Sequence, residues 1–208
     1  MNDYRETEHG RLLCGIQERK NEFLKEFRKE HPRACDIHAY ISVNDDKYKG
    51  QFIKVYNGKC AYCGVSNLSI PKEMFEIDHF CPKEMSRFKT KAEAGQIENL
   101  VLACHTCNHN KHDFEVPDAQ HDNLHPDLEG IKDAFYRDEL FYIRVSEGQP
   151  RVTEQFYEQL RLGRETARID YLLMSMRDLF ERIESKPEIH DMLGSAIMLL
   201  QSKRNCAV

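Results

Sequence analysis

Four of the eight cysteines stand in two Cys-x-x-Cys pairs, Cys60/Cys63 and Cys104/Cys107. One tight turn can present both thiolates of a pair, and four thiolates complete the tetrahedral coordination of a zinc ion. Such a closed sphere leaves no position for water, so the pattern predicts a structural zinc site. A redox pair, an iron–sulfur cluster and buried cysteines without metal are the alternatives. Two pairs in one short, turn-rich region favour zinc, although the span between them exceeds that of a simple zinc ribbon.

Residues between these pairs could carry out acid–base and metal chemistry. Asp78 and His79 are adjacent, within the sequence Ile-Asp-His-Phe-Cys-Pro at residues 77–82. An imidazole titrates near neutral pH and can take a proton from water, whereas a carboxylate is a hard oxygen ligand for Mg²⁺. On a regular strand the two side chains point to opposite faces. A bulge or bend would be needed to bring both side chains to one site, and the strand pattern alone does not predict one.

The order of these residues resembles the HNH endonuclease family, also called ββα-metal nucleases. The family pattern is Cys-x-x-Cys, then Asp-His-hydrophobic-x-Pro, then Asn-Leu, and finally Cys-x-x-Cys-Asn/His-x-x-Lys. The matching residues, in order, are Cys60, Cys63, Asp78, His79, Pro82, Asn99, Leu100, Cys104, Cys107, Asn108 and Lys111. The resemblance covers roughly residues 58–113 and does not extend to the flanking segments.

The resemblance implies a role for each polar residue in phosphodiester hydrolysis. His79 is expected to be the general base, and Asp78 and Asn108 are expected to hold one divalent ion. Asn99 is expected to form hydrogen bonds across the loop and to orient His79. The third family position can be His or Asn. It is Asn108 here, and an amide ligand suits Mg²⁺ or Mn²⁺.

A short helix over residues 107–112 would begin at the last zinc cysteine. Helical spacing would place His112 on the same face as Asn108, and in part of the family a His at this step is a second metal ligand. His112 is therefore a secondary candidate for binding the catalytic ion. His109 is expected to face away from the site, into solvent.

A short basic run directly follows the Asp-His element. It contains Lys83, Arg87, Lys89 and Lys91, and Lys111 lies nearby on the expected helix. These cations could contact the phosphates that flank the scissile bond. The alternative is that the run is only a solvated loop.

The composition limits how such a site could bind nucleic acid. The 208 residues include 30 Lys+Arg and 35 Asp+Glu, and the net charge of −5 excludes a basic coat over the whole surface. The first residues lack the apolar core of a signal peptide, and no segment approaches the roughly 18 apolar residues of a membrane span. We therefore expect a cytoplasmic protein, a setting in which disulfides are rare and metal is the first explanation for clustered cysteines.

The segments outside the cysteine-rich core are mostly helical by their periodicity. Apolar residues recur at spacings near three and four over residues 12–29 and 45–56, and again within residues 153–203. His31-Pro32 is expected to end the first of these helices. The last segment contains an apolar stripe that we expect to pack in the core: Leu172, Met176, Leu179, Phe180 and Ile183.

Residues 75–80 and 140–145 have strand character, and a turn at residues 147–150 predicts a hairpin that continues at Arg151. The predicted fold class is α+β, mainly α, with a zinc-stabilised ββα core flanked by N- and C-terminal helices and a β-hairpin. The predicted segments are residues 1–57 (helical), 58–113 (nuclease core with the zinc site), 114–152 (loop and hairpin) and 153–208 (C-terminal helices).

The sequence thus predicts a metal-dependent HNH endonuclease with structural Zn²⁺ and catalytic Mg²⁺ or Mn²⁺, and with DNA as its expected substrate. A catalytically silent zinc module that binds nucleic acid or protein is the alternative. Compact bacterial HNH proteins with flanking helices occur in anti-phage and restriction systems, and in Septu-type systems the nuclease works beside an ATPase subunit. By analogy, a protein partner such as an ATPase is expected, with the C-terminal helices as its docking surface.

Overall fold

A computed structural model describes residues 3–43, 46–85, 87–183 and 186–206. Six of its helices span seven residues or more: α1 (Ile16–Glu30), α3 (Asp46–Val55), α5 (His105–Lys111), α8 (Arg151–Gln159), α9 (Glu165–Phe180) and α10 (Pro187–Cys206). Short helices lie between them: α2 (His38–Ile41), α4 (Lys91–Ala94), α6 (His121–Leu124), α7 (Gly130–Ala134) and the 3-10 turns η1 (Lys72–Met74), η2 (Ile97–Asn99) and η3 (Asp118–Gln120). No described helix is long and apolar enough to cross a membrane.

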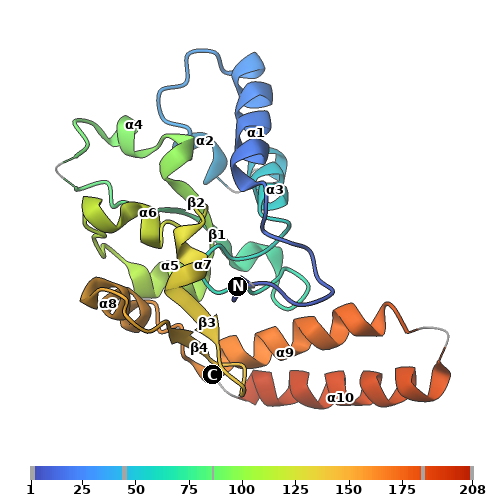
Figure 1. Ribbon diagram of the computed structural model, residues 1–208. Helices are drawn as coiled ribbons and strands as arrows, with labels where there is room; N and C mark the ends of the chain where they lie inside the picture. Colours follow the sequence, from blue (N-terminus) through green and yellow to red (C-terminus); the bar gives the residue numbers. More distant parts are fainter. Residues whose placement is uncertain (1–2, 44–45, 86, 184–185, 207–208) are drawn as a thin grey trace.

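A ββα unit lies at the centre of the molecule (Figure 1). Strand β1 (Phe75–His79) pairs antiparallel with β2 (Leu100–Cys104), and α5 begins at the next residue and packs against both strands. This confirms the predicted α+β, mainly α, fold class and its ββα core. The register runs without interruption to His79, which pairs with Leu100. A bulge between Asp78 and His79 is therefore absent from this strand pair.

The second hairpin differs from its prediction. Strand β3 (Phe135–Arg137) pairs with β4 (Ile143–Val145). The strand predicted over residues 140–145 therefore pairs with an earlier segment of the chain, not with the later segment that begins at Arg151. Arg151 does not continue the hairpin but begins α8. Pro150, with φ −60°, stands directly before that helix, where its missing N–H costs nothing. Asp138 closes the hairpin turn, because its carboxylate accepts the backbone N–H groups of Leu140 and Tyr142 at 3.0 and 2.9 Å.

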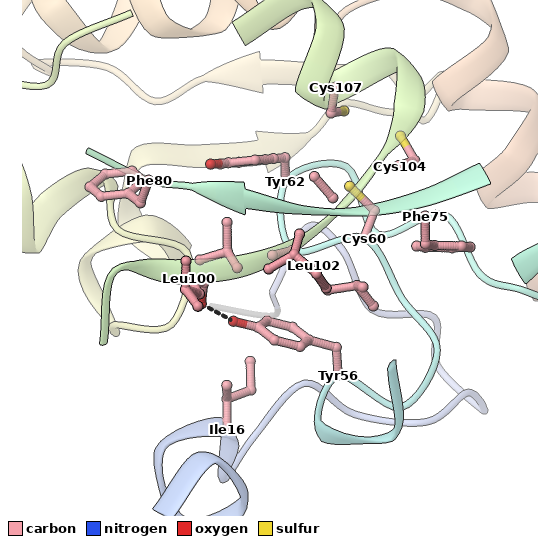
Figure 2. Packing of buried hydrophobic residues seen from close by; sticks show 14 of the residues in the cluster. Ile16, Tyr56, Cys60, Tyr62, Phe75, Phe80, Leu100, Leu102, Cys104 and Cys107 are labelled. Atoms are coloured by element: carbon pink, nitrogen blue, oxygen red, sulfur yellow. Dashed lines mark hydrogen bonds between the residues drawn. The ribbon is translucent and has the colours of Figure 1, made fainter. Parts of the chain in front are cut away.

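Buried side chains from α1, from the end of α3 and from both strands share one core (Figure 2). A buried polar network ties α1 to the first residue of β2. The Lys20 ammonium donates to the Leu100 carbonyl at 2.6 Å and forms an ion pair with Asp127. The Tyr56 hydroxyl donates to the same Asp127 carboxylate at 2.8 Å. The N-terminal helices therefore brace the strand that leads into the zinc ligands.

The helical predictions hold in their main points. Helix α1 ends where His31-Pro32 predicted, and α3 falls within residues 45–56, of which Asp45 lies outside the described residues. The prediction that an apolar stripe within residues 153–203 packs in the core is wrong. Leu179 is exposed, and the other four side chains of the stripe are only half-buried: Leu172, Met176, Phe180 and Ile183. Phe180 instead stacks on His190 of α10, with ring centroids 3.7 Å apart. Helices α9 and α10 form an arm that extends from the body (Figure 1).

Candidate active site and zinc centre

The two cysteine pairs meet at one point, although 40 residues separate them. The Sγ atoms of Cys60, Cys63, Cys104 and Cys107 all lie within 4.8 Å of one another, and all four residues are buried. Among the described residues, this is the one group of three or more His, Cys, Asp or Glu side chains gathered so closely. Four thiols at this spacing fit a structural zinc ion in closed tetrahedral coordination.

The local backbone explains how the first pair converges. Gly64 follows Cys63 with φ +78°, and its N–H donates to the Cys60 carbonyl at 2.9 Å. A side chain at Gly64 would also place a Cβ 2.5 Å from the backbone oxygen of Arg5. Only glycine suits both the left-handed conformation and this close approach. Cys104 ends β2 and Cys107 lies in the first turn of α5, so the zinc ligands join the hairpin to the helix.

Two arginines outside the cysteine motifs support this centre. The Arg164 guanidinium donates to Cys107 Sγ at 3.6 Å. Burial acts against its charge, but the surrounding thiolates of Cys107 and Cys63 raise the pKa of Arg164. Arg5 is fully buried and donates to the carbonyl of Ala61, between the first two cysteines, at 2.7 Å. Neither residue carries a sequence signal that links it to the cysteines.

Three of the four residues predicted to act in catalysis, Asp78, His79 and Asn108, line one open cleft of about 360 Å³, whereas Asn99 is not among its lining residues. Asp78 and His79 reach it from the end of β1, and Asn108 and His112 reach it from α5 and its C-terminus. His112 has φ +50°, so the helix ends one residue earlier than expected. His109 also lines the cleft, which corrects the expectation that it faces away.

His79 has the features of a residue kept free for proton transfer. Its side chain lies 4.1 Å, centroid to centroid, from the ring of His38. Its Nε2 atom is buried and finds no hydrogen-bond partner within the described part of the chain. Burial, reinforced by the neighbouring His38 and Lys83, lowers the pKa of His79 to about 3. The imidazole is therefore neutral at physiological pH, which is the form that can accept a proton, but the lowered pKa makes it a weaker base than an unperturbed histidine.

The prediction that Lys111 contacts a phosphate of the substrate is corrected by its burial. Its side chain is fully buried, because this face of α5 packs on β1. The ammonium lies 3.1 Å from the Asp78 carboxylate and donates to the His79 carbonyl at 2.8 Å. The Tyr62 hydroxyl donates to the same carboxylate at 2.5 Å. Burial raises the pKa of Asp78, and Lys111 and Tyr62 oppose that rise.

Replacing Lys111 with methionine is expected to destabilise the fold by about 3 kcal/mol, because it leaves the Asp78 carboxylate buried without its counter-charge. Urea denaturation of the zinc-loaded protein measures this loss. Lys25→Met provides the control, because Lys25 is exposed on α1; it should change stability by less than about 0.5 kcal/mol. Equal stabilities of the two variants would contradict the structural role of Lys111.

Asn99 closes the loop that follows His79. Its side chain forms a pair of hydrogen bonds with the backbone of Cys81, accepting from N–H at 2.8 Å and donating to C=O at 3.0 Å. A further bond reaches the Ala94 carbonyl at 2.9 Å. These contacts cross the loop, as the family resemblance implies. They hold the backbone two residues beyond His79, so the effect of Asn99 on the orientation of His79 stays a prediction.

Sequence analysis missed two residues beside the cleft. The Glu76 carboxylate accepts a hydrogen bond from the Asn108 side-chain amide and another from His105 Nδ1, the latter at 2.7 Å. The period of a strand already places Glu76 on the face of Asp78, and this signal could have identified it. His38 Nε2 donates to the Ile77 carbonyl at 3.2 Å, next to His79. Nothing in the local sequence links His38 to the cleft.

The basic run divides into two parts. Lys83 lines the cleft, whereas Lys89 and Lys91 are exposed and are not among its lining residues. Arg87 is different, because its guanidinium forms an ion pair with Asp118 and donates to Cys81 Sγ at 3.1 Å. The Arg87 guanidinium is therefore already paired within the protein, which makes a phosphate contact by Arg87 less favourable than one by Lys83.

The family comparison agrees with the geometry of this region. Residues 60–114 match the family model described as HNH endonuclease. Comparison with curated proteins and with solved structures gave no match. The matched segment contains the ββα unit, the four clustered cysteines and the cleft beside them. Residues 60–114 of this chain are therefore similar to the HNH endonuclease family in sequence, and they contain the ββα arrangement that this resemblance implies.

Proposed function

We propose that this chain is a metal-dependent endonuclease that hydrolyses phosphodiester bonds of DNA. The observation that carries the proposal is the meeting of Asp78, His79 and Asn108 in one cleft on a zinc-type ββα core. A neutral imidazole, a carboxylate and an amide are the groups that water activation and metal binding require. The cleft is open, which suits a polymer substrate that enters from the side.

The cleft offers oxygen and nitrogen donors for a divalent ion such as Mg²⁺ or Mn²⁺. Asp78 and Asn108 would hold it, with His112 as a further ligand. The Asn108 amide nitrogen is bound to Glu76, so its Oδ1 atom is the part left for a cation. When bound, such an ion supplies positive charge to the phosphate oxygens and the leaving oxygen.

The protein's own groups account for the remaining requirements of hydrolysis. The neutral His79 imidazole takes a proton from the attacking water and becomes an imidazolium ion. The Lys111 ammonium holds both the Asp78 carboxylate and the His79 carbonyl, which fixes the end of β1. Asn99 fixes the loop that follows. Lys83, at the edge of the cleft, is suited to bind a phosphate next to the scissile bond.

A plasmid assay tests this function. Purified, zinc-loaded protein is incubated with supercoiled DNA and Mg²⁺ or Mn²⁺, and parallel reactions contain EDTA or a single-stranded RNA. The expected result is metal-dependent conversion to open circles, with EDTA abolishing it. Cleavage of RNA alone would move the substrate class to RNA. A folded protein that cuts neither substrate with any divalent ion would favour a silent zinc module.

Removing the exposed cations of the basic run is expected to weaken DNA binding. Lys83→Ala, Lys89→Ala and Lys91→Ala should each reduce the dependence of log K on log salt by about 0.9, the value for one phosphate contact. Arg87→Ala should leave this slope unchanged, as should the control Lys25→Ala on α1. Fluorescence anisotropy of a labelled duplex at several salt concentrations measures the slope. Equal slopes for all five variants would show that the run is a solvated loop.

The biological setting is a further part of the proposal. The net charge of −5 favours delivery of DNA by a protein partner such as an ATPase subunit, in the cytoplasm and in anti-phage defence. Phage plating on cells that express the chain with its neighbouring genes tests this setting. Fewer plaques are expected with the wild type than with His79→Ala. Equal plaque numbers for every phage tried would contradict it.

A further inference from the structure

Helix α10 presents an apolar strip to solvent. None of its 20 residues is buried. Three large apolar side chains that share one face of the helix are between 49% and 74% exposed: Ile189, Met192 and Leu199. The opposite side of the helix is already occupied by α9, through Phe180 against His190 and through an Arg204–Asp170 ion pair at 2.9 Å. The strip therefore lies on the side of α10 that faces away from α9, the helix beside it in the arm (Figure 1).

The spacing of this strip is that of a helix-pairing seam. Ile189, Met192, Ala196 and Leu199 follow one another at intervals of three, four and three residues. Two helices that pack along their length bury residues at these intervals. An exposed apolar strip of this kind marks an interaction surface in a protein that is otherwise highly charged.

The ends of α10 indicate what covers the strip. Acidic Glu188 lies in its first turn and basic Lys203 in its last turn, and both are exposed; the Lys203 ammonium also lies 4.0 Å from the Glu165 carboxylate of α9. When α10 is set antiparallel to a second α10 so that Met192 meets Leu199, the same register places Glu188 opposite Lys203. The two-fold symmetry of such a pair makes each of these contacts twice. The small residues Ser195 and Ala196 fall at the crossing point, where the helices approach most closely.

We infer that α10 pairs antiparallel with α10 of a second copy, and that the protein is a two-fold symmetric dimer. Apolar contacts supply the attraction, and the terminal charges fix the antiparallel direction. The inference stands whether or not the chain is a nuclease. If the proposed function holds, the dimer carries two clefts and can cut both strands of a duplex.

The first test measures mass in solution by sedimentation equilibrium. The wild-type protein is expected at twice the chain mass of 24.5 kDa. Met192→Glu is expected at the single-chain mass, because it places a carboxylate against Leu199 of the second copy at both ends of the apolar seam. Val43→Glu, an exposed apolar site just after α2, is the matched control and should stay dimeric. A monomeric wild type, or a Met192→Glu variant that remains dimeric, would overturn the inference.

A charge-reversal series separates self-pairing from binding to another protein. Glu188→Lys and Lys203→Glu should each raise the dimer dissociation constant about tenfold, because each creates two like-charge contacts. The chain that carries both reversals restores opposite charges across the interface, so its constant should return towards the wild-type value. Circular dichroism confirms that each variant is folded. A double variant that dimerises no better than either single variant would refute this register.

Discussion

Replacing Cys104 with serine is expected to unfold the ββα core, not only to lower the rate of catalysis. Cys104 ends β2 immediately before α5 and lies within 4.8 Å of the other three thiols. A structural zinc site of this kind contributes about 10–16 kcal/mol of binding free energy, which exceeds or matches the stability of a typical domain. Loss of one ligand should therefore abolish the cooperative thermal transition and the near-ultraviolet signal of the buried tyrosines.

The control for this prediction is Cys35→Ser, because Cys35 is exposed and lies outside the cluster. It should retain the wild-type melting temperature and one zinc ion per chain by elemental analysis. A chelator strong enough to remove the zinc should reproduce the Cys104→Ser result in the wild-type protein. A Cys104→Ser variant that melts like Cys35→Ser, or wild-type protein without zinc, would contradict the zinc centre.

The cysteine cluster could be predicted because spacing alone determines much of its chemistry. Two Cys-x-x-Cys pairs present four thiolates wherever the chain brings them together, and little else about the fold is needed. The supporting groups were not predictable in this way. Arg164 reaches the centre from the position just before α9, and Arg5 reaches it from the N-terminal segment; only the tertiary packing places them there.

Lys111 and Arg87 show that the exposure of a charged side chain cannot be predicted from the sequence pattern alone. Lysine and arginine are exposed in most proteins, so Lys111 and Arg87 were assigned to the phosphates. Whether they are exposed depends on which face of α5 packs on β1 and on where Asp118 lies. His38 illustrates the same limit, because its contact with His79 joins residues 41 positions apart in the chain.

The strand-versus-helix error after Pro150 has a comparable cause. Residues 151–153, Arg-Val-Thr, are compatible with a strand, and the preceding Gly-Gln-Pro is compatible with a turn. Proline is also favoured immediately around the start of a helix. Phe156 and Leu160, both buried, draw the segment into α8 against the core. Tertiary burial therefore decided between two local structures that the sequence permitted.

His79→Ala is expected to lower the rate of DNA nicking by about 10²–10⁴-fold, the contribution of a positioned general base. The imidazole is neutral, lines the cleft and has an unpartnered Nε2 atom, so its loss removes the group suited to accept the proton from water. The zinc centre and the hydrogen bonds of Asn99 do not involve this side chain. The variant should therefore still bind zinc and DNA.

The most direct test is the initial rate of supercoiled-plasmid nicking in Mg²⁺ or Mn²⁺ for wild type, His79→Ala and His9→Ala, each verified as folded and zinc-loaded. His9 lies outside the cleft and controls for the loss of a histidine. Equal rates are expected for wild type and His9→Ala, and a rate at least about 100-fold lower is expected for His79→Ala. Nicking by His79→Ala at the wild-type rate would contradict the assignment of this cleft as the active site.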